Sequence, residues 1–282
     1  MRPTSLGVIG LGAIGGSLAW QSRLAGVRRV VGYSPNPAEG VQALKASAIT
    51  ELAASPEAAA AGVELVVLAV PPTATLQLLE PVAAALDSTA CLTDVCSVKA
   101  PIVAQAVAAG IGDRFAGSHP LAGTHETGFG SARPDRLRGC VVYVCESGTP
   151  LSHRAAARVA AFWEETLEAS PVFIRPDAHD RQLAWTSHLS QAVASALARV
   201  LADQGLGGVS FGPGTRDTTR LAASSPEMWS DIFLYNRAAV GDALQQVEAS
   251  LSELRGFLNA GDREALRRYL ETAQSFRQGI DK

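Results

Sequence analysis

The feature that most constrains the fold of this chain is a cluster of three glycines near its start. Gly10, Gly12 and Gly15 follow the apolar run 6–9 and precede a segment with helical character, 13–25. Between a strand and a helix, the first glycine of such a cluster permits a tight turn, and the second lets the backbone approach a pyrophosphate. The third lets the helix pack closely on the strand. The N-terminus of the helix suits phosphate groups because its N–H groups are free. We therefore expect a dinucleotide site, and a glycine-rich turn without a ligand is the alternative. The expected cofactor-binding residues of this turn are Gly10, Leu11, Gly12, Ala13, Ile14 and Gly15.

Apolar runs and helix-compatible segments continue to alternate along the N-terminal part of the chain. The expected strands are 30–33, 65–70, 90–94, 140–145 and 172–174, and the expected helices are 38–47, 73–86, 98–108 and 152–167. Continuous apolar strands that alternate with helices indicate a parallel sheet covered on both faces. We therefore expect an α/β fold with a doubly wound parallel sheet of the Rossmann type.

The character of the chain changes at Pro176, after which no segment looks like a strand. The expected helices are 177–203, 226–259 and 262–278, with a glycine-rich break at 205–214. A length of 282 residues suggests about two domains, at roughly 150 residues for each. We expect a dinucleotide-binding domain over residues 1–175 and an all-helical domain over residues 176–282.

The charge and hydropathy of the chain exclude several classes of protein. Its 24 basic and 27 acidic residues give a net charge of −3, and without a basic tail the chain is a poor nucleic-acid binder. A hydrophobic fraction of 47% is too high for a disordered protein. No apolar stretch reaches the about 18 residues of a membrane helix, and no signal-peptide pattern opens the chain. We therefore expect a cytoplasmic protein that binds neither nucleic acid nor membrane.

The four cysteines give no sign of a metal site or a disulfide scaffold. Cys91 and Cys96, like Cys140 and Cys145, are five residues apart and form no C-x-x-C pair. In strands this spacing puts the two members of a pair on opposite faces. We expect ordinary buried thiols and no metal.

Three further residues are expected beside the cofactor, and the first of them bears on the choice between NAD and NADP. In NAD enzymes an acidic residue after the second strand binds the ribose 2′-hydroxyl. Ser34 stands in that place here, and a hydroxyl does not repel a 2′-phosphate, so the sequence favours NADP, with NAD as the alternative. Val70 and Pro71 end the third central strand, at the edge of the sheet where ligands bind in such folds, and are expected beside the cofactor.

Polar residues gather in two peptides at later strand ends. The segment 93–99 carries Ser97 and Lys99, and the segment 117–124 carries His119. Together with the glycine cluster, these peptides resemble prephenate and arogenate dehydrogenases, the TyrA family. The likeness continues in Asp177-Ala178-His179-Asp180, Ser187-His188-Leu189, Arg216-Asp217-Thr218-Thr219-Arg220 and Met228-Trp229. It spans nearly the whole chain in the same order.

The resemblance implies an oxidative decarboxylation of a cyclohexadienyl acid in tyrosine biosynthesis. A nicotinamide takes hydride from the ring carbon that bears the hydroxyl, and the ring carboxylate leaves as carbon dioxide. Hydride leaves readily only if the hydroxyl proton is also withdrawn, which calls for a base that titrates near neutrality, and histidine suits this task. By resemblance, His119 is that catalytic base and Ser97 hydrogen-bonds the same hydroxyl. The alternatives are a histidine that only shapes a turn and a serine that caps the helix 98–108.

An anionic substrate needs fixed positive charge. By resemblance, Arg220 matches the family's substrate-binding arginine. A guanidinium can hold a carboxylate bidentately, which suits this role. Asp217 precedes it by a turn and is expected to orient it; an ordinary surface charge cluster is the alternative. Thr124 is also expected among the substrate-binding residues.

The helix after Pro176 is expected to add further substrate contacts. Asp180, Ala184, His188 and Gln191 recur at spacings that share one helix face, and His188 and Gln191 are expected in the pocket. His179 projects about half a turn away from His188 and is expected against the cofactor domain or a partner subunit. A core or capping histidine is the alternative for both.

Gln191 and Lys99 stand out against their surroundings. Gln191 replaces a histidine of many prephenate-specific relatives, which favours arogenate or dual specificity because a neutral amide better tolerates an amino-acid side chain. Lys99 is one of only three lysines in the chain. Its ammonium therefore either has a local purpose or is a solvated first-turn lysine.

The helical domain resembles the family's dimerisation domain, and a homodimer is expected. An apolar stripe with helical spacing supports this and could equally be intramolecular core. The stripe consists of Trp229, Phe233, Leu234, Val240, Leu244, Val247, Leu251, Leu254 and Leu258.

Two other functions are considered as alternatives. A 3-hydroxy acid-type dehydrogenase uses a lysine of its second domain, and no lysine lies between Lys99 and Lys282, which argues against it. A non-catalytic NADP(H)-binding redox sensor would not need polar residues concentrated at strand ends.

Overall fold

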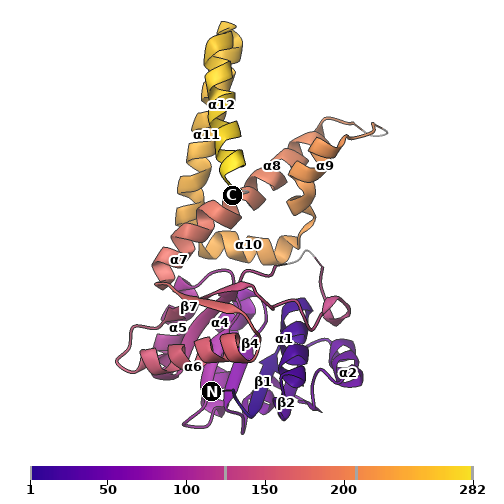
Figure 1. Ribbon diagram of the computed structural model, residues 1–282, viewed down its shortest axis with the longest axis vertical. Helices are drawn as coiled ribbons and strands as arrows, with labels where there is room; N and C mark the ends of the chain where they lie inside the picture. Colours follow the sequence, from indigo (N-terminus) through magenta and orange to yellow (C-terminus); the bar gives the residue numbers. More distant parts are fainter. Residues whose placement is uncertain (1, 124–125, 207–208, 281–282) are drawn as a thin grey trace. The chain divides into compact units, whose positions relative to one another are not determined.

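The computed structural model describes residues 2–123, 126–206 and 209–280. Its contacts divide the chain into two compact units, Met1–Asn236 and Arg237–Lys282. The first unit contains the whole sheet together with the helices as far as α10 (Pro226–Tyr235). Figure 1 labels the main elements.

The first unit is built on a sheet of eight strands in the order β3-β2-β1-β4-β5-β6-β7-β8. The strands are β1 (Ser5–Ile9), β2 (Arg29–Tyr33), β3 (Glu51–Leu52), β4 (Leu65–Leu68), β5 (Cys91–Asp94), β6 (Phe115–Pro120), β7 (Val141–Glu146) and β8 (Ser170–Phe173). Neighbouring strands are parallel except β6 and β7, which pair antiparallel. The strand order reverses between β1 and β4, and such a switch point is where doubly wound sheets bind ligands. The expected Rossmann-type sheet is confirmed, with one reversal that the sequence did not predict.

Helices cover both faces of this sheet, each over its own apolar cluster. One cluster takes buried residues from α1 (Ala13–Leu24), α2 (Pro37–Lys45) and α6 (Ser152–Glu165). The other takes them from α3 (Pro56–Ala60), α4 (Pro72–Ala85) and α5 (Ala100–Ala108). Leu6 and Val8 of β1 belong to the first cluster, whereas Ile9 belongs to the second. Because strand side chains alternate between faces, one short apolar strand supplies both layers.

The rest of the first unit is helical. Its elements are α7 (Pro176–Leu183), a π turn (Ala184–His188), α8 (Leu189–Asp203), α9 (Pro213–Thr219), a 3-10 turn (Arg220–Ala223) and α10. The single helix expected over 177–203 therefore contains a wide π turn, and the helix expected over 226–259 is interrupted at Asn236. The sequence did not predict α9, which follows the glycine-rich break. The expected boundary at Pro176 marks a change in the kind of secondary structure, whereas the compact units separate after Asn236.

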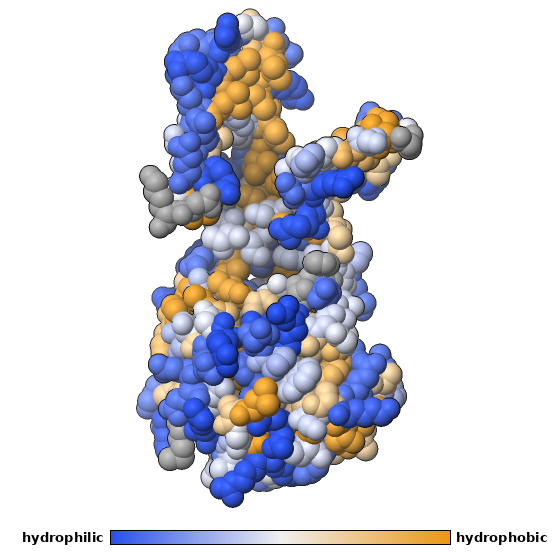
Figure 2. All heavy atoms as spheres, turned by 45° about the vertical axis from the view of Figure 1, so that its right-hand side comes forward, coloured by the Kyte–Doolittle hydropathy of each residue, from blue (hydrophilic) through white to orange (hydrophobic). Residues whose placement is uncertain are grey.

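The second unit consists of α11 (Arg237–Ala260) and α12 (Arg263–Ile280). The two helices pack through Tyr269, whose ring contacts Phe257 and whose hydroxyl lies 2.7 Å from Ser250 Oγ. Large apolar side chains on this pair remain exposed, among them Leu251, Leu258 and Phe276. Figure 2 shows apolar atoms gathered along the α11–α12 pair. None of the described helices has both the length and the apolar character needed to span a bilayer.

The four cysteines are free thiols. Cys91, Cys96 and Cys145 are buried, and Cys140 is partly buried. Burial raises the pKa of Cys96 and Cys145 to about 12, so both thiols are protonated and unreactive at neutral pH. Within the described residues, no group of three or more histidine, cysteine or acidic side chains is arranged to hold a metal ion.

Candidate active site

The glycine turn after β1 has the geometry of a dinucleotide cradle. Gly10 has φ +99°, and a Cβ there would lie 2.3 Å from the Ala69 carbonyl oxygen. A Cβ on Gly15 would lie 1.9 Å from the Gly10 carbonyl oxygen, whereas one on Gly12 would meet no described atom within 4 Å. Gly12 is also the N-cap residue of α1. Packing therefore requires glycine at the first and third positions, while the second borders open space at a helix N-terminus, which fits a pyrophosphate.

The segment after β4 lies beside this turn. A Cβ on Gly10 would lie 2.8 Å from Val70 Cγ1, and Pro71 is the N-cap residue of α4. Thr73, in the first turn of α4, is bound to α10: its amide donates to Asp231 Oδ2 at 3.2 Å, and its hydroxyl lies 3.0 Å from the Tyr235 hydroxyl. Helix α10 is thus bound to the first turn of α4, next to the sheet edge where the cofactor is expected.

Ser34 lies directly after β2, as expected, but its hydroxyl is already engaged. It donates to Glu39 Oε2 at 2.6 Å and accepts from the Asn36 amide at 3.2 Å. Glu39 belongs to the first turn of α2. This carboxylate was not among the expected cofactor-binding residues, although a glutamate in the first turn of a helix that starts Asn-Pro is visible in the sequence.

A buried ion pair joins the ends of β5 and β6. Lys99 and Asp94 are completely buried and form a salt bridge. Lys99 Nζ also donates to the Ser118 carbonyl at 2.7 Å, and Asp94 Oδ2 accepts from the Cys96 amide at 2.9 Å. The alternative of a solvated first-turn lysine is therefore wrong, because the Lys99 side chain is completely buried. Its ammonium bonds to groups at the ends of both strands, one of which precedes Ser97 and the other of which carries His119.

His119, at the end of β6, is the first member of a buried chain of three side chains. Its Nδ1 lies 2.9 Å from His179 Nε2, and His179 Nδ1 lies 2.8 Å from Asp180 Oδ1. A carboxylate only accepts hydrogen bonds, so His179 Nδ1–H donates to Asp180, and neutral His179 then accepts at Nε2 from His119 Nδ1–H. This order leaves the lone pair of His119 on Nε2. His179 thus contacts the α/β part of the chain, one of the two places expected for it.

The electrostatic surroundings favour neutral histidines. Burial holds the pKa of His119 well below 6.5, and the nearby His179, Lys99 and His188 lower it further. Burial also lowers the pKa of His179, although its hydrogen bond to Asp180 acts in the opposite direction. The pKa of His188 falls to about 4, again chiefly through burial. All three rings are therefore neutral at pH 7, and His119 can accept a proton.

Asp180 has a second function at the start of α5. Its Oδ1 accepts from the Lys99 amide at 2.7 Å and its Oδ2 from the Ala100 amide at 2.8 Å, so this carboxylate caps α5 from another helix. The alternative of Ser97 as the cap is wrong, because the helix begins at Ala100. Ser97 is half-buried, and its hydroxyl forms no hydrogen bond within the described parts of the chain.

The helix face expected to be shared by Asp180, Ala184, His188 and Gln191 is buried at all four positions. The π turn lies within it and shifts the residues that follow relative to a regular helix. Asn236 Nδ2 lies 3.1 Å from His188 Nδ1, and an amide nitrogen donates, so His188 carries its proton on Nε2. That atom is buried and has no hydrogen-bond partner among the described residues, although the backbone of Ser97 is near enough to raise the pKa of the ring. The Trp229 ring lies edge-on at 5.9 Å from His188.

The other expected substrate residues are not joined to His119 by any contact of the described residues. Arg220 and Asp217 are exposed and form no ion pair within the ranges that the structure describes. Gln191 Nε2 donates to the carbonyl of Leu221 at 2.9 Å, so its contacts support the segment that carries Arg220. Thr124 lies outside the described residues.

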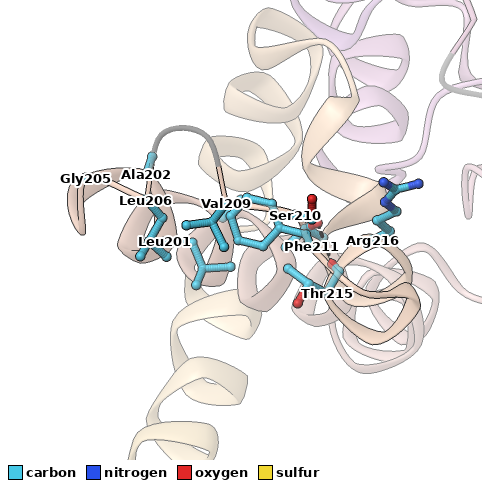
Figure 3. A pocket seen from close by; sticks show the side chains of 11 residues that line it. Leu201, Ala202, Gly205, Leu206, Val209, Ser210, Phe211, Thr215 and Arg216 are labelled. Atoms are coloured by element: carbon cyan, nitrogen blue, oxygen red, sulfur yellow. Dashed lines mark hydrogen bonds between the residues drawn. The ribbon is translucent and has the colours of Figure 1, made fainter.

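A separate hollow of about 630 Å³ lies between the end of α8 and α9. Figure 3 shows apolar side chains around it, including Leu201, Val209 and Phe211, with Arg216 at its side. None of the residues around His119 lines this hollow.

Three contacts in the buried cluster that contains His119 and His188 could not be predicted from the sequence. The pairing of His179 with His119 depends on where α7 packs, and no local pattern predicts it. Asp180 was expected on one helix face with Ala184, His188 and Gln191, and that spacing does not indicate its contacts with the amides of Lys99 and Ala100. Asn236 carries no sequence signal, since it is an isolated polar residue at the end of α10.

Comparison with known proteins gives a consistent picture. The family model described as "Prephenate dehydrogenase, nucleotide-binding domain" matches residues 18–170, and that described as "Prephenate dehydrogenase, dimerization domain" matches residues 175–272. A prephenate dehydrogenase of Bacillus subtilis is 31% identical over 99% of this chain and 76% of its own length.

Two solved structures also match over nearly their whole length. A prephenate dehydrogenase from Aquifex aeolicus, in complex with hydroxyphenyl propionate and NAD+, has 29% identity and a TM-score of 0.89 over 99% of this chain and 98% of its own. Synechocystis arogenate dehydrogenase has 28% identity and a TM-score of 0.78 over 98% of this chain and 99% of its own. The glycine cradle, the buried histidines and both family models agree, and the chain belongs to the prephenate dehydrogenase family.

Proposed function

We propose that this protein is an NAD(P)-dependent dehydrogenase that oxidatively decarboxylates a cyclohexadienyl acid, arogenate or prephenate or both, in tyrosine biosynthesis. The observation that carries this proposal is the His119–His179–Asp180 chain at the end of β6, in a unit that also holds the glycine cradle. The relatives support the substrate class, because those from Bacillus subtilis and Synechocystis are named for prephenate and arogenate, respectively.

His119 acts as the proton acceptor. A bound nicotinamide supplies the hydride acceptor, and His119 Nε2 withdraws the proton of the hydroxyl on the same carbon. Its lowered pKa keeps the ring neutral before the reaction. The hydrogen bond from His119 Nδ1 to His179 fixes the ring orientation and the tautomer, and Asp180 stabilises the positive charge that develops across the two rings. His179 and Asp180 are thus positioning residues.

Ser97 completes the reacting centre. The Ser97 hydroxyl, unengaged by the described residues, hydrogen-bonds the substrate hydroxyl and holds it toward His119. Loss of carbon dioxide then aromatises the ring, so the residues need to supply no further electron sink.

The carboxylates of the substrate require donors and positive charge. His188 Nε2–H is a buried donor without a partner in the described chain, and an anionic oxygen would satisfy it. Arg220 supplies the guanidinium, Asp217 one turn earlier in the chain orients it, and Gln191 supports its segment through Leu221. Since Gln191 adds no cation, arogenate or dual specificity remains our proposal.

We also propose a nucleotide-binding domain over residues 1–175 and a helical domain over 176–282 that forms a homodimer. The description of the second family model and the exposed apolar side chains of the α11–α12 pair support this arrangement. An exposed apolar surface of this kind is typical of subunit interfaces.

A steady-state assay of prephenate and arogenate, each with NAD+ and NADP+, tests the function. Reduction of a cofactor together with release of carbon dioxide is the expected result. If neither acid reduces either cofactor, the proposal fails, and cofactor binding without turnover would point to a redox sensor instead.

A further inference from the structure

A carboxylate from the next helix, Glu39 of α2, lies at the end of β2 beside Ser34. In a doubly wound sheet this strand end faces the ribose that distinguishes NAD from NADP. Ser34 is buried there, and its hydroxyl donates to Glu39 Oε2 at 2.6 Å. The hydroxyl of Ser34 is therefore engaged, and the group presented at this position is the carboxylate of Glu39.

The carboxylate is held from several sides. Asn36 accepts from the Ala38 amide at 3.1 Å and so caps α2, which places Glu39 in the first turn, where the helix dipole favours a negative charge. A Cβ on Gly128, which has φ +77°, would lie 3.4 Å from Glu39 Oε1, so the backbone of Gly128 lies close to the second carboxylate oxygen. Glu39 is only partly exposed. One oxygen thus contacts Ser34 and the other faces Gly128, which restricts the side chain to this place.

Among the residues that the structure describes, no cation is paired with the carboxylate of Glu39. The segment 34–39 contains no lysine or arginine, and Glu39 forms no ion pair within the described residues. Arg29, at the start of β2, is already paired with Glu51 and donates to the Gly62 carbonyl. A 2′-phosphate would bring close to two negative charges to this site, and no guanidinium of the described ranges is paired with Glu39 to offset them.

We propose that Glu39, held by Ser34, selects NAD+ over NADP+. Its carboxylate accepts a hydrogen bond from the 2′-hydroxyl of the adenosine ribose and repels a 2′-phosphate. This inference rests on the proposed function only in that the chain binds a nicotinamide dinucleotide, and it reverses the preference for NADP predicted from Ser34. The carboxylate of a Rossmann-type NAD site is here supplied from five residues further along, by the next helix.

Direct binding tests the inference without any substrate. NAD+ and NADP+ are titrated into the full-length protein by isothermal titration calorimetry, with wild type, Glu39→Gln and Glu57→Gln compared at one ionic strength. Glu57 is a matched control, because it is also a first-turn glutamate that follows a residue with a capping side chain, here Ser55 on α3 in place of Asn36 on α2. Wild type and Glu57→Gln are expected to bind NAD+ at least about tenfold more tightly than NADP+, because the Glu39 carboxylate and the 2′-phosphate repel each other.

Glu39→Gln keeps an acceptor for the 2′-hydroxyl and removes the charge. It is expected to bind NAD+ within about threefold of wild type and to gain at least about fivefold in affinity for NADP+. A wild-type preference for NADP+, or an unchanged affinity ratio in Glu39→Gln, would overturn the inference and leave the proposed function standing. Failure of wild type to bind either dinucleotide would instead remove the proposed function and, with it, the inference.

Discussion

His119 Nδ1 and His179 Nε2 lie 2.9 Å apart, although 60 residues separate them in the chain. This bond joins the end of β6 to α7, and Asp180 extends it to the start of α5 through the amides of Lys99 and Ala100. One carboxylate therefore orients the proposed base and caps the helix that follows Ser97. The geometry of the reacting centre depends on how α7 packs against the α/β part.

Replacing His119 removes the proposed base. His119→Asn is expected to lower kcat by about 10²–10⁴-fold, the usual contribution of a positioned base. Steady-state kinetics and the Kd of the cofactor check this together, and the Kd is expected to change little. Wild-type turnover in the variant would remove His119 from its role.

Two substitutions of His179 distinguish its hydrogen bond to His119 from the space that its side chain fills. His179→Gln keeps a carbonyl oxygen able to accept from His119 Nδ1–H, whereas His179→Leu leaves that donor unpaired and the ring free to adopt the other tautomer. We expect His179→Leu to lose at least about tenfold more kcat than His179→Gln, comparable to one hydrogen bond involving a charged group. Cofactor affinity serves as the control. Equal kcat values for the two variants would contradict the positioning role.

The pH dependence of activity follows from the lowered pKa of His119. The base works only when neutral, so kcat/KM is expected to fall as pH decreases through the folded-state pKa, which lies below 6.5. A pH profile of kcat/KM should therefore already be on its plateau at pH 6.5. An acidic limb centred above that pH would show that burial does not control this group.

Acid destabilisation follows from the same burial. The pKa of His188 is about 4 in the fold against 6.5 for an exposed histidine, so the unfolded chain binds the proton more readily. The neutral form contributes its full stability above pH 6.5, and this stability is lost as the pH falls toward about 4. His188 alone contributes on the order of 3 kcal/mol to this loss. Urea unfolding between these pH values measures it, and His188→Gln should flatten the dependence; an equally steep dependence in that variant would contradict the assignment.

Arg220 is expected to act on substrate affinity. Arg220→Ala should raise KM for the acid by about 10–100-fold, the value of a charge-assisted hydrogen bond, with a smaller effect on kcat. Arg199, an exposed arginine of α8 paired with Asp203, is the matched control. An equal rise in KM from Arg199→Ala and Arg220→Ala would show that net charge rather than a specific contact matters.

The local parts of the fold could be predicted from the sequence. The glycine roles at Gly10 and Gly15, most strands and the buried face that includes His188 follow from spacing and steric limits within a few residues. Strand β6 was given no bounds, although His119 was expected at a strand end, because it contains glycine, serine, histidine and proline. Strand β3 was not predicted because it has only two residues. The reversal of β7 depends on strand pairing, which apolar content does not encode.

The sequence by itself determined the kind of protein: a glycine cradle on a parallel sheet, a family resemblance carried by short motifs, and a histidine at a strand end. Tertiary structure alone decided which groups meet. It paired His119 with His179, made Asp180 rather than Ser97 the cap of α5, buried Lys99 against Asp94, and brought Glu39 back to Ser34. The physical reason is that a motif depends on local sterics, whereas the partner of a buried polar group depends on which distant element excludes water from it.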